Sequence, residues 1–268
     1  MEALLGYGFF QRALLAGLFV AFACAILGLF LVLRRDAMIG HGLSHVTFGG
    51  VALGLFLNVL PLAAALVVAV LASLAIMKLR EKAGLHGDTA IGILSSVGMA
   101  VGIALATLAG RFNVDLLSYL FGDILAISPV EVGLSVALAA VALTLIFANY
   151  HKLMYATFDR EAAKASGVQI GRLDLLLTVL TSVTVVLGMK VVGILMVTAL
   201  LVIPAAAGLQ LAVNFKQALV LSSLTAVFSV VLGLLASYSL NLPAAATIVV
   251  IAFLFFGIFF LLRQRQSR

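Results

Sequence analysis

Charge is the property that this sequence has least of. Only 10% of its 268 residues are Asp, Glu, Lys or Arg, while 65% are hydrophobic. A soluble domain carries roughly 25% charged residues, so this chain has too few to cover itself with a polar surface. We therefore expect lipid to surround most of it, which excludes an ordinary soluble enzyme.

Several motifs of covalent chemistry are missing as well. The single cysteine, Cys24, excludes a disulfide framework and a Cys-based metal cluster. No glycine-rich loop ends in Gly-Lys-Ser/Thr, so the chain does not hydrolyse a nucleotide by that route. The stretch HGLSH at 41–45 lacks the glutamate that a zinc protease uses as its base, and no acid near Ser44 orients a histidine. We predict that the protein is not an enzyme and has no catalytic residues.

Long uncharged runs fill the chain instead. Residues 13–33 contain no charge and match the roughly 20 residues that cross a bilayer. This run is too long for the core of a signal peptide, and arginines rather than a cleavage site follow it. The nine candidate spans lie at about 13–33, 38–57, 60–77, 89–110, 129–149, 173–189, 191–213, 217–237 and 243–262.

Residues 112–128 are also apolar, but Asp115 and Asp123 interrupt them. We predict a re-entrant or outer-surface segment there, because irregular backbone at membrane depth must be covered by protein or by a water-filled cavity. The predicted fold class is therefore all-α, a polytopic transmembrane helix bundle of about eight or nine spans. We expect a single membrane domain over residues 1–268.

The basic residues predict the orientation in the membrane. With the N-terminus outside, 13 of the 16 Lys and Arg residues fall in cytoplasmic segments, and only Arg12, Arg111 and Lys190 remain outside. Cytoplasmic loops carry an excess of Lys and Arg, so we predict this orientation, with the C-terminus in the cytoplasm. The net charge of +6 then reflects the ends of spans and indicates no nucleic-acid partner.

Two histidines open the second candidate span. His41 and His45 are four residues apart, which places them on one helix face, one turn from each other. Neutral imidazole binds zinc well and manganese, nickel and iron less selectively, so the pair forms half of a tetrahedral metal site. The alternative is that both rings hydrogen-bond carbonyls or hydroxyls inside a packed bundle. Asp123 is a further candidate, as a gate residue that attracts the cation at the outer side.

The longest polar segment, residues 150–172, is cytoplasmic in this orientation. It predicts a short amphipathic helix that begins at an Asp159 cap and ends at Gly167. An acidic residue and two helix formers follow the cap: Glu161, Ala162 and Ala163. The residues alone leave two alternatives open, since either another protein docks on this helix or the helix lies on lipid headgroups.

Gly50 and Gly54 form a small-xxx-small pair in the second candidate span. Such pairs let two helices approach closely in lipid. We predict a helix contact there, although a chain with 24 glycines contains such pairs by chance.

Several longer stretches have the pattern of a known family: RRDAMIGHGLSHVTFGGVALG, SYLFGDILAI, FDREAAKASGV, MKVVGILMVTALLVIPAAAG and SYSLNLPAAATIVV. Together they cover most of the chain in the family's order. On these stretches the chain resembles the permease subunits of bacterial ABC importers for zinc, manganese and iron, which include the zinc-uptake permease. The resemblance implies the ABC importer permease fold and a multi-pass protein of the bacterial cytoplasmic (inner) membrane.

The resemblance also implies partners. A second permease copy would complete a homodimer around the path, ABC ATPase subunits would hydrolyse ATP, and an extracytoplasmic metal-binding protein would deliver the ion. FDREAAKASGV would be the coupling helix that docks into the ATPase, within a coupling segment at about 154–171. The residues given this role are Asp159, Glu161, Ala162, Ala163 and Gly167. No permanently bound cofactor is implied, since the divalent metal ion is the cargo.

At the head of the second span the family usually has Gly-Asp-x-x-x-His. His45 matches that histidine, whereas His41 stands where aspartate is usual, and Ser96 stands where some zinc permeases have histidine. A His/His pair is softer than an Asp/His pair, which favours zinc over manganese. We therefore predict zinc as the imported ion, carried by alternating access.

The sequence also allows three different interpretations. The cargo could be manganese or iron, or it could be a metal chelate, whose wider path needs no facing imidazoles. A self-contained secondary transporter is a different class of protein. It would normally show repeated halves and intramembrane carboxylates, and neither is evident in this sequence.

Overall fold

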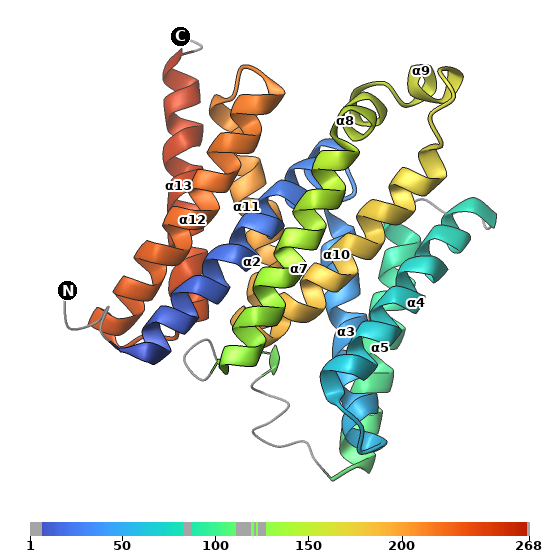
Figure 1. Cartoon of the computed structure of the whole chain (residues 1–268), viewed down its shortest axis with the longest axis vertical. Coiled ribbons are helices and arrows are strands. Elements are labelled where there is room, and N and C mark those ends of the chain that lie inside the picture. Colours follow the sequence, from blue (N-terminus) through green and yellow to red (C-terminus); the bar gives the residue numbers. More distant parts are fainter. Residues whose placement is uncertain (1–6, 83–86, 111–118, 121, 123–126, 267–268) are drawn as a thin grey trace.

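The computed structural model describes residues 7–82, 87–110, 119–120, 122 and 127–266. Every regular element within these ranges is an α-helix, and the helices form an elongated bundle (Figure 1). In chain order they are α2 (Gly8–Leu33), α3 (Met38–Phe56), α4 (Pro61–Lys82), α5 (Gly87–Leu108), α7 (Pro129–Ala148), α8 (Tyr150–Phe158), α9 (Arg160–Ala165), α10 (Ile170–Val192), α11 (Ile194–Leu211), α12 (Phe215–Leu240) and α13 (Ala244–Gln266).

Eight of the described helices are long and apolar enough to cross a membrane, namely all except α8, α9 and α11. Helix α11 contributes a shorter apolar segment, Met196–Leu211. This confirms the predicted all-α polytopic bundle of about eight or nine spans. Most of the segment predicted at 112–128, including Asp115 and Asp123, lies outside the described residues, so its re-entrant character stays a prediction.

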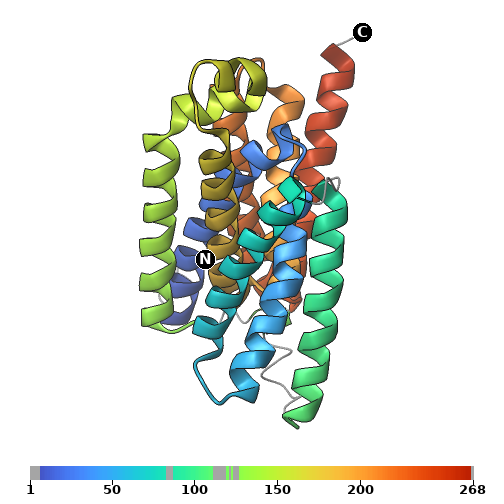
Figure 2. The ribbon, with the colours of Figure 1, turned by 90° about the vertical axis from the view of Figure 1, so that its right-hand side faces the viewer.

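The bundle has two outer groups of helices and a middle layer. Helices α3, α4 and α5 pack together on one side, and α11, α12 and α13 pack together on the other. Helices α2, α7 and α10 lie between these groups. Figure 2 shows that the short helices α8 and α9 lie at the same end of the bundle as the end of α13. Helix α2 begins at the opposite end.

Helix α3 is mostly buried within the chain, whereas α5 and α13 are mostly exposed. Lipid tails are as apolar as leucine, so α3 is held by close packing rather than by escape from water. A Cβ added at Gly50 would lie 2.7 Å from the Ala65 Cα, and one at Gly54 would lie 2.7 Å from the Pro61 Cα. At both points α3 therefore touches the backbone of α4, where even a methyl group has no space.

This contact makes a testable prediction for Gly50→Ala. The added methyl group should push α3 from α4 and lower the free energy of unfolding by about 1–3 kcal/mol, the usual cost of overpacking. The matched control is Gly92→Ala on α5, because an added Cβ at Gly92 meets nothing within 4 Å. Thermal unfolding of both variants in detergent checks the difference. Equal melting temperatures would contradict the close contact at Gly50.

Candidate metal centre

The imidazoles of His41 and His45 lie against each other on the first half of α3. Their Nε2 atoms are 3.2 Å apart, and their ring centroids are 4.6 Å apart with the ring planes at 87°. His41 is exposed and His45 is half-buried, and the exposed Met38 precedes them on the same face. The i, i+4 spacing thus turns two ring nitrogens toward one point at an open side of the chain.

The separation of the two nitrogens suits one shared ion. Two nitrogens bound to a zinc ion at about 2.0–2.1 Å and the tetrahedral angle lie roughly 3.3–3.4 Å apart. The observed 3.2 Å therefore needs only a small rotation of the rings. No group of three or more His, Cys, Asp or Glu side chains that could hold a metal occurs among the described residues. An ion at this pair must take its other ligands from water, from carbonyl or hydroxyl oxygens, or from another chain.

The hydroxyl groups beside the pair have partners of their own. Ser44 Oγ donates to the His41 carbonyl oxygen at 2.6 Å, and Thr47 Oγ1 donates to the Leu43 carbonyl oxygen at 2.7 Å. Both side chains are buried, away from the exposed face that carries His41. Ser44 is therefore not placed as a nucleophile. In the described part of the chain the two rings contact each other. This contact disfavours the alternative in which both rings hydrogen-bond carbonyls or hydroxyls inside a packed bundle.

A tight turn leads into α3. The Asp36 amide donates to the Leu31 carbonyl at 2.8 Å and the Arg35 amide to the Val32 carbonyl at 3.1 Å. These two bonds form a Schellman motif. The residue just after the C-cap of such a motif has a left-handed backbone and is therefore usually glycine. Arg35 holds that position with φ of 60°. A side chain costs energy in this conformation, so contacts on either side of Arg35 must hold the turn.

Ion pairs supply those contacts. Arg34 pairs with Asp174 on α10, and Asp36 Oδ1 accepts from Arg80 Nη2 on α4 at 2.7 Å. The second oxygen of Asp174 accepts from Arg160 Nη2 on α9 at 2.6 Å. The charge pattern along the sequence places these arginines at cytoplasmic span ends but does not predict the network. Asp174 could have indicated an ion pair, because it is a carboxylate inside the span predicted at 173–189, and an intramembrane charge needs a partner.

The segment at 150–172 contains the short helix predicted after Asp159, as α9, and also a helix that was not predicted, α8. It forms two helices, α8 and α9, because Asp159 takes an extended conformation between them, with φ of −142° and ψ of 93°. The Asp159 carboxylate accepts from the Ala162 amide at 2.9 Å, which confirms the predicted cap. Beyond α9 the chain turns at Gly167, where φ is 82°. Glu161 is exposed, whereas Ala163 is buried against the bundle.

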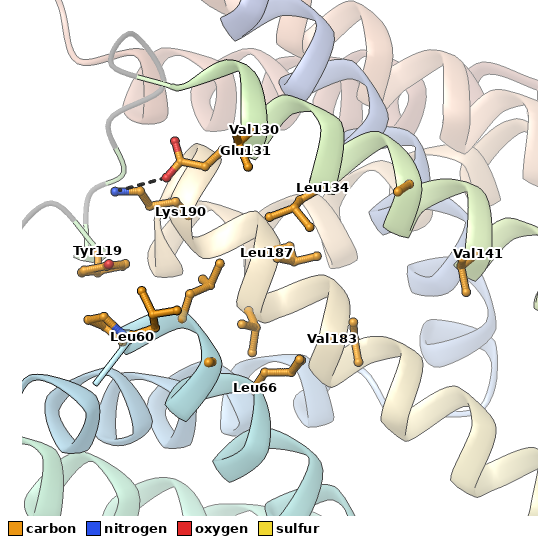
Figure 3. A pocket seen from close by; sticks show the side chains of 15 residues that line it. Leu60, Leu66, Tyr119, Val130, Glu131, Leu134, Val141, Val183, Leu187 and Lys190 are labelled. Carbon is orange, nitrogen blue, oxygen red and sulfur yellow. Dashed lines mark ion pairs between the residues drawn. The ribbon is translucent and has the colours of Figure 1, made fainter. Parts of the chain in front are cut away.

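A separate cavity of about 720 Å³ lies between α4, α7 and α10 (Figure 3). Its walls are almost entirely apolar. At one end Lys190 Nζ lies 3.7 Å from Glu131 Oε1 and 5.1 Å from the centre of the Tyr119 ring. Glu131, the carboxylate among the described residues of its lining, is therefore paired with Lys190. Asp123, the candidate gate residue, lies outside the described residues.

Known proteins resemble the chain over nearly its full length. Residues 6–263 match the family described as the ABC 3 transport family. The manganese transport system membrane protein MntC of Listeria innocua is 31% identical over 267 residues, which are 100% of this chain and 95% of that protein. The manganese import system permease protein ScaB of Streptococcus gordonii is 31% identical over 266 residues, covering 99% and 95%.

A solved structure has the same architecture. The structure of PsaBC from Streptococcus pneumoniae in complex with Fab matches with a TM-score of 0.84 and 34% identity. The match covers 97% of this chain and 93% of that one.

The geometry of the pair makes a second testable prediction. His41→Ala and His45→Ala should each weaken manganese and zinc binding to the purified protein. Loss of a direct ligand should exceed the roughly 10–100-fold cost of losing a group that only supports a ligand. His151→Ala is the control, because this exposed histidine on α8 forms a ring contact with Tyr150 and lies outside the proposed site. Equilibrium dialysis measures the affinities, and unchanged binding in both variants would exclude the pair.

Proposed function

The chain belongs to the ABC 3 transport family and is the non-catalytic, membrane-spanning permease subunit of a divalent-metal ABC importer, and we propose that His41 and His45 contact the passing ion. The observation that carries the proposal is the 3.2 Å approach of two ring nitrogens on an open face of a membrane helix. Polar side chains in membrane spans usually face a cavity, a partner or a transport path.

The incompleteness of the pair fits transport. An ion held by two ligands from the protein is bound strongly enough to enter and weakly enough to leave. In a homodimer, each copy would present one such pair to a shared central path. We propose this arrangement because His41 is exposed in the single chain and because few other described groups nearby could take the ion.

Manganese is the ion that the relatives favour. MntC of Listeria innocua and ScaB of Streptococcus gordonii are named as manganese proteins, and both align with nearly the whole chain. The sequence alone favours zinc, and these relatives support the manganese alternative better. We propose manganese as the cargo and keep zinc as the second candidate. The observation for zinc is the all-nitrogen pair, because His41 provides an imidazole rather than a carboxylate.

A metal chelate and a secondary transport mechanism both have less support. A chelate would need a wide path in which the two imidazoles serve no purpose, yet here they are turned toward each other. A self-contained secondary transporter is disfavoured because the chain belongs to a family of ABC importer permeases.

The end of the bundle that carries α8 and α9 is the proposed docking site for the ATPase. Helix α9 and the end of α13 lie at this end (Figures 1 and 2), and both carry exposed basic residues. The excess of Lys and Arg supports a cytoplasmic position for this end and an outside position for the start of α2. The coupling segment at about 154–171 then presents Glu161 and Gly167 to the ATPase, and the metal-binding protein approaches from the opposite end.

Reconstitution tests the function and the ion. In liposomes that contain the permease, its ATPase and its binding protein, manganese should stimulate both ATP hydrolysis and ion uptake. Stimulation by zinc alone would favour the second candidate, and stimulation by neither ion would contradict the proposal.

The choice of ion should follow the ligand at position 41. His41→Asp replaces a nitrogen with a harder carboxylate oxygen, so the ratio of manganese to zinc uptake should rise. His41→Asn is the control, because it removes the imidazole without adding charge. If His41→Asp leaves the ratio as in the wild type, His41 does not contact the ion.

The coupling assignment has its own test at Gly167, where φ is 82°. Gly167→Ala forces a side chain into a left-handed backbone, so the end of α9 should shift and association with the ATPase should weaken. Gly110→Ala is a matched control, since Gly110 has φ of 61° and lies after α5, at the proposed outer end. Co-purification of the ATPase is the measurement. Equal loss in both variants would point to general misfolding instead of a lost docking contact.

A further inference from the structure

We propose that Arg160, Asp174 and Arg34 form an ionic relay that transmits movement of α9 to α3 and hence positions His41 and His45 during transport. The inference rests on the proposed function, in which α9 meets the ATPase and the histidines meet the ion. The three residues come from three separate elements, α9, α10 and the turn before α3. They are positioning residues, because they act on the ion through α3.

Asp174 is the centre of the relay. Its Oδ1 contacts Arg34 Nη2, and its Oδ2 accepts from Arg160 Nη2 at 2.6 Å. Exposure falls along the relay, from 56% for the Arg160 side chain to 15% for Asp174 and 5% for Arg34. The relay thus runs from the proposed ATPase surface into the bundle through a single carboxylate.

The buried end of the relay is difficult to break. A buried charge that loses its partner is strongly destabilised, because neither water nor another charge replaces the contact. Arg34 Nη1 already lacks a hydrogen-bond partner among the described residues, so Asp174 is its main compensation. When Asp174 moves, Arg34 should therefore move with it. The exposed contact of Arg160 is weaker and can be exchanged for water or for another protein.

The turn passes this movement on to α3. Arg34 lies at the end of α2, and α3 begins at Met38, one turn before His41. The Schellman hydrogen bonds and the left-handed Arg35 make the turn stiff. Asp36 is held on the other side by Arg80 of α4 at 2.7 Å, so the turn pivots between α10 and α4. A shift of Asp174 would rotate the start of α3, which carries both histidines.

Space for such movement exists beneath α9. A cavity of about 420 Å³ lies between α4, α9 and α10, and its lining includes Arg80, Arg160 and Asp174. Helix α9 is therefore not packed tightly against α4 at this point. If the network were only a static link, its loss would lower stability but would leave the coupling of transport to ATP hydrolysis unchanged.

The test uses the complete complex of permease, ATPase and binding protein in liposomes. The readout is manganese uptake per ATP hydrolysed. Arg160→Gln removes the exposed contact and leaves the buried pair intact, so the chain should still fold, and dividing uptake by the ATP hydrolysed corrects for any change in ATPase association. Uptake per ATP should fall by about fivefold or more, in line with typical coupling energies between sites. Arg160→Lys should restore most of it, because it keeps the charge.

Arg172→Gln is the matched control. It removes one positive charge from the exposed start of α10, two residues before Asp174, and Arg172 forms no ion pair among the described residues. Uptake per ATP should stay at the wild-type value in this variant. An equal loss in Arg160→Gln and Arg172→Gln would overturn the relay, since it would show a general effect of surface charge.

A double variant separates a relay from two independent contacts. Because Arg160 acts through Asp174, Arg160→Gln should add little to the defect of Asp174→Asn. If the two defects multiply, the relay is wrong. Should Asp174→Asn fail to fold, the comparison of Arg160→Gln with Arg160→Lys and Arg172→Gln still decides the question.

The outcomes also distinguish the relay from the proposed function. A wild-type complex that takes up neither manganese nor zinc would refute the function itself. A wild-type complex that transports manganese, together with an Arg160→Gln complex that has the same uptake per ATP, would refute the relay alone.

Discussion

A charge buried in a membrane protein must have a partner. In this chain Arg34 and Asp174 are such partners, and they lie at the turn that leads into α3. The pair fastens the turn between α2 and α3 to α10, although the two residues are 140 positions apart in sequence. The ion pair of Asp36 with Arg80 holds the same turn from α4. Because α3 begins directly after this turn, the placement of its two histidines depends on how the charges at the turn are paired.

The histidines differ from several hydroxyl groups on α3, α4 and α10 that are satisfied within their own helices. Thr47, Ser73 and Thr181 each donate to the carbonyl four residues earlier, as hydroxyls in membrane helices commonly do. His41 and His45 contact each other and remain open to what lies beside α3. In a permease of a divalent-metal importer, two exposed ring nitrogens at 3.2 Å are a chemically sensible contact for the cargo.

Much of this could be predicted from the sequence, wherever a short pattern determines the local structure. Uncharged runs predicted the helices, and the four-residue spacing predicted that His41 and His45 share a face. Asp159 had the residue type of a helix cap and forms one. Helix α8 was missed, because Asp159 was interpreted only as the start of a helix, whereas it also ends the preceding one.

The network at the turn was missed for a different reason. Its partners are brought together only by the packing of α2, α4, α9 and α10, and Arg35 takes a backbone conformation that sequence patterns assign to glycine. Zinc was also given more weight from the sequence than the relatives support. Ligand softness was inferred from two residues, whereas the described part of the chain has no group of three or more His, Cys, Asp or Glu side chains that would define the coordination shell. The relatives MntC and ScaB are named as manganese proteins, which supports the manganese alternative better than zinc.

The central claim is that the passing ion binds the imidazoles of α3. X-ray absorption at the manganese edge, recorded on the complete transporter loaded with manganese, measures this contact directly. We predict the multiple-scattering signal of imidazole rings around the metal in the wild type and its loss in the His41→Ala, His45→Ala double variant. A shell of oxygen atoms alone, identical in the two proteins, would contradict the claim.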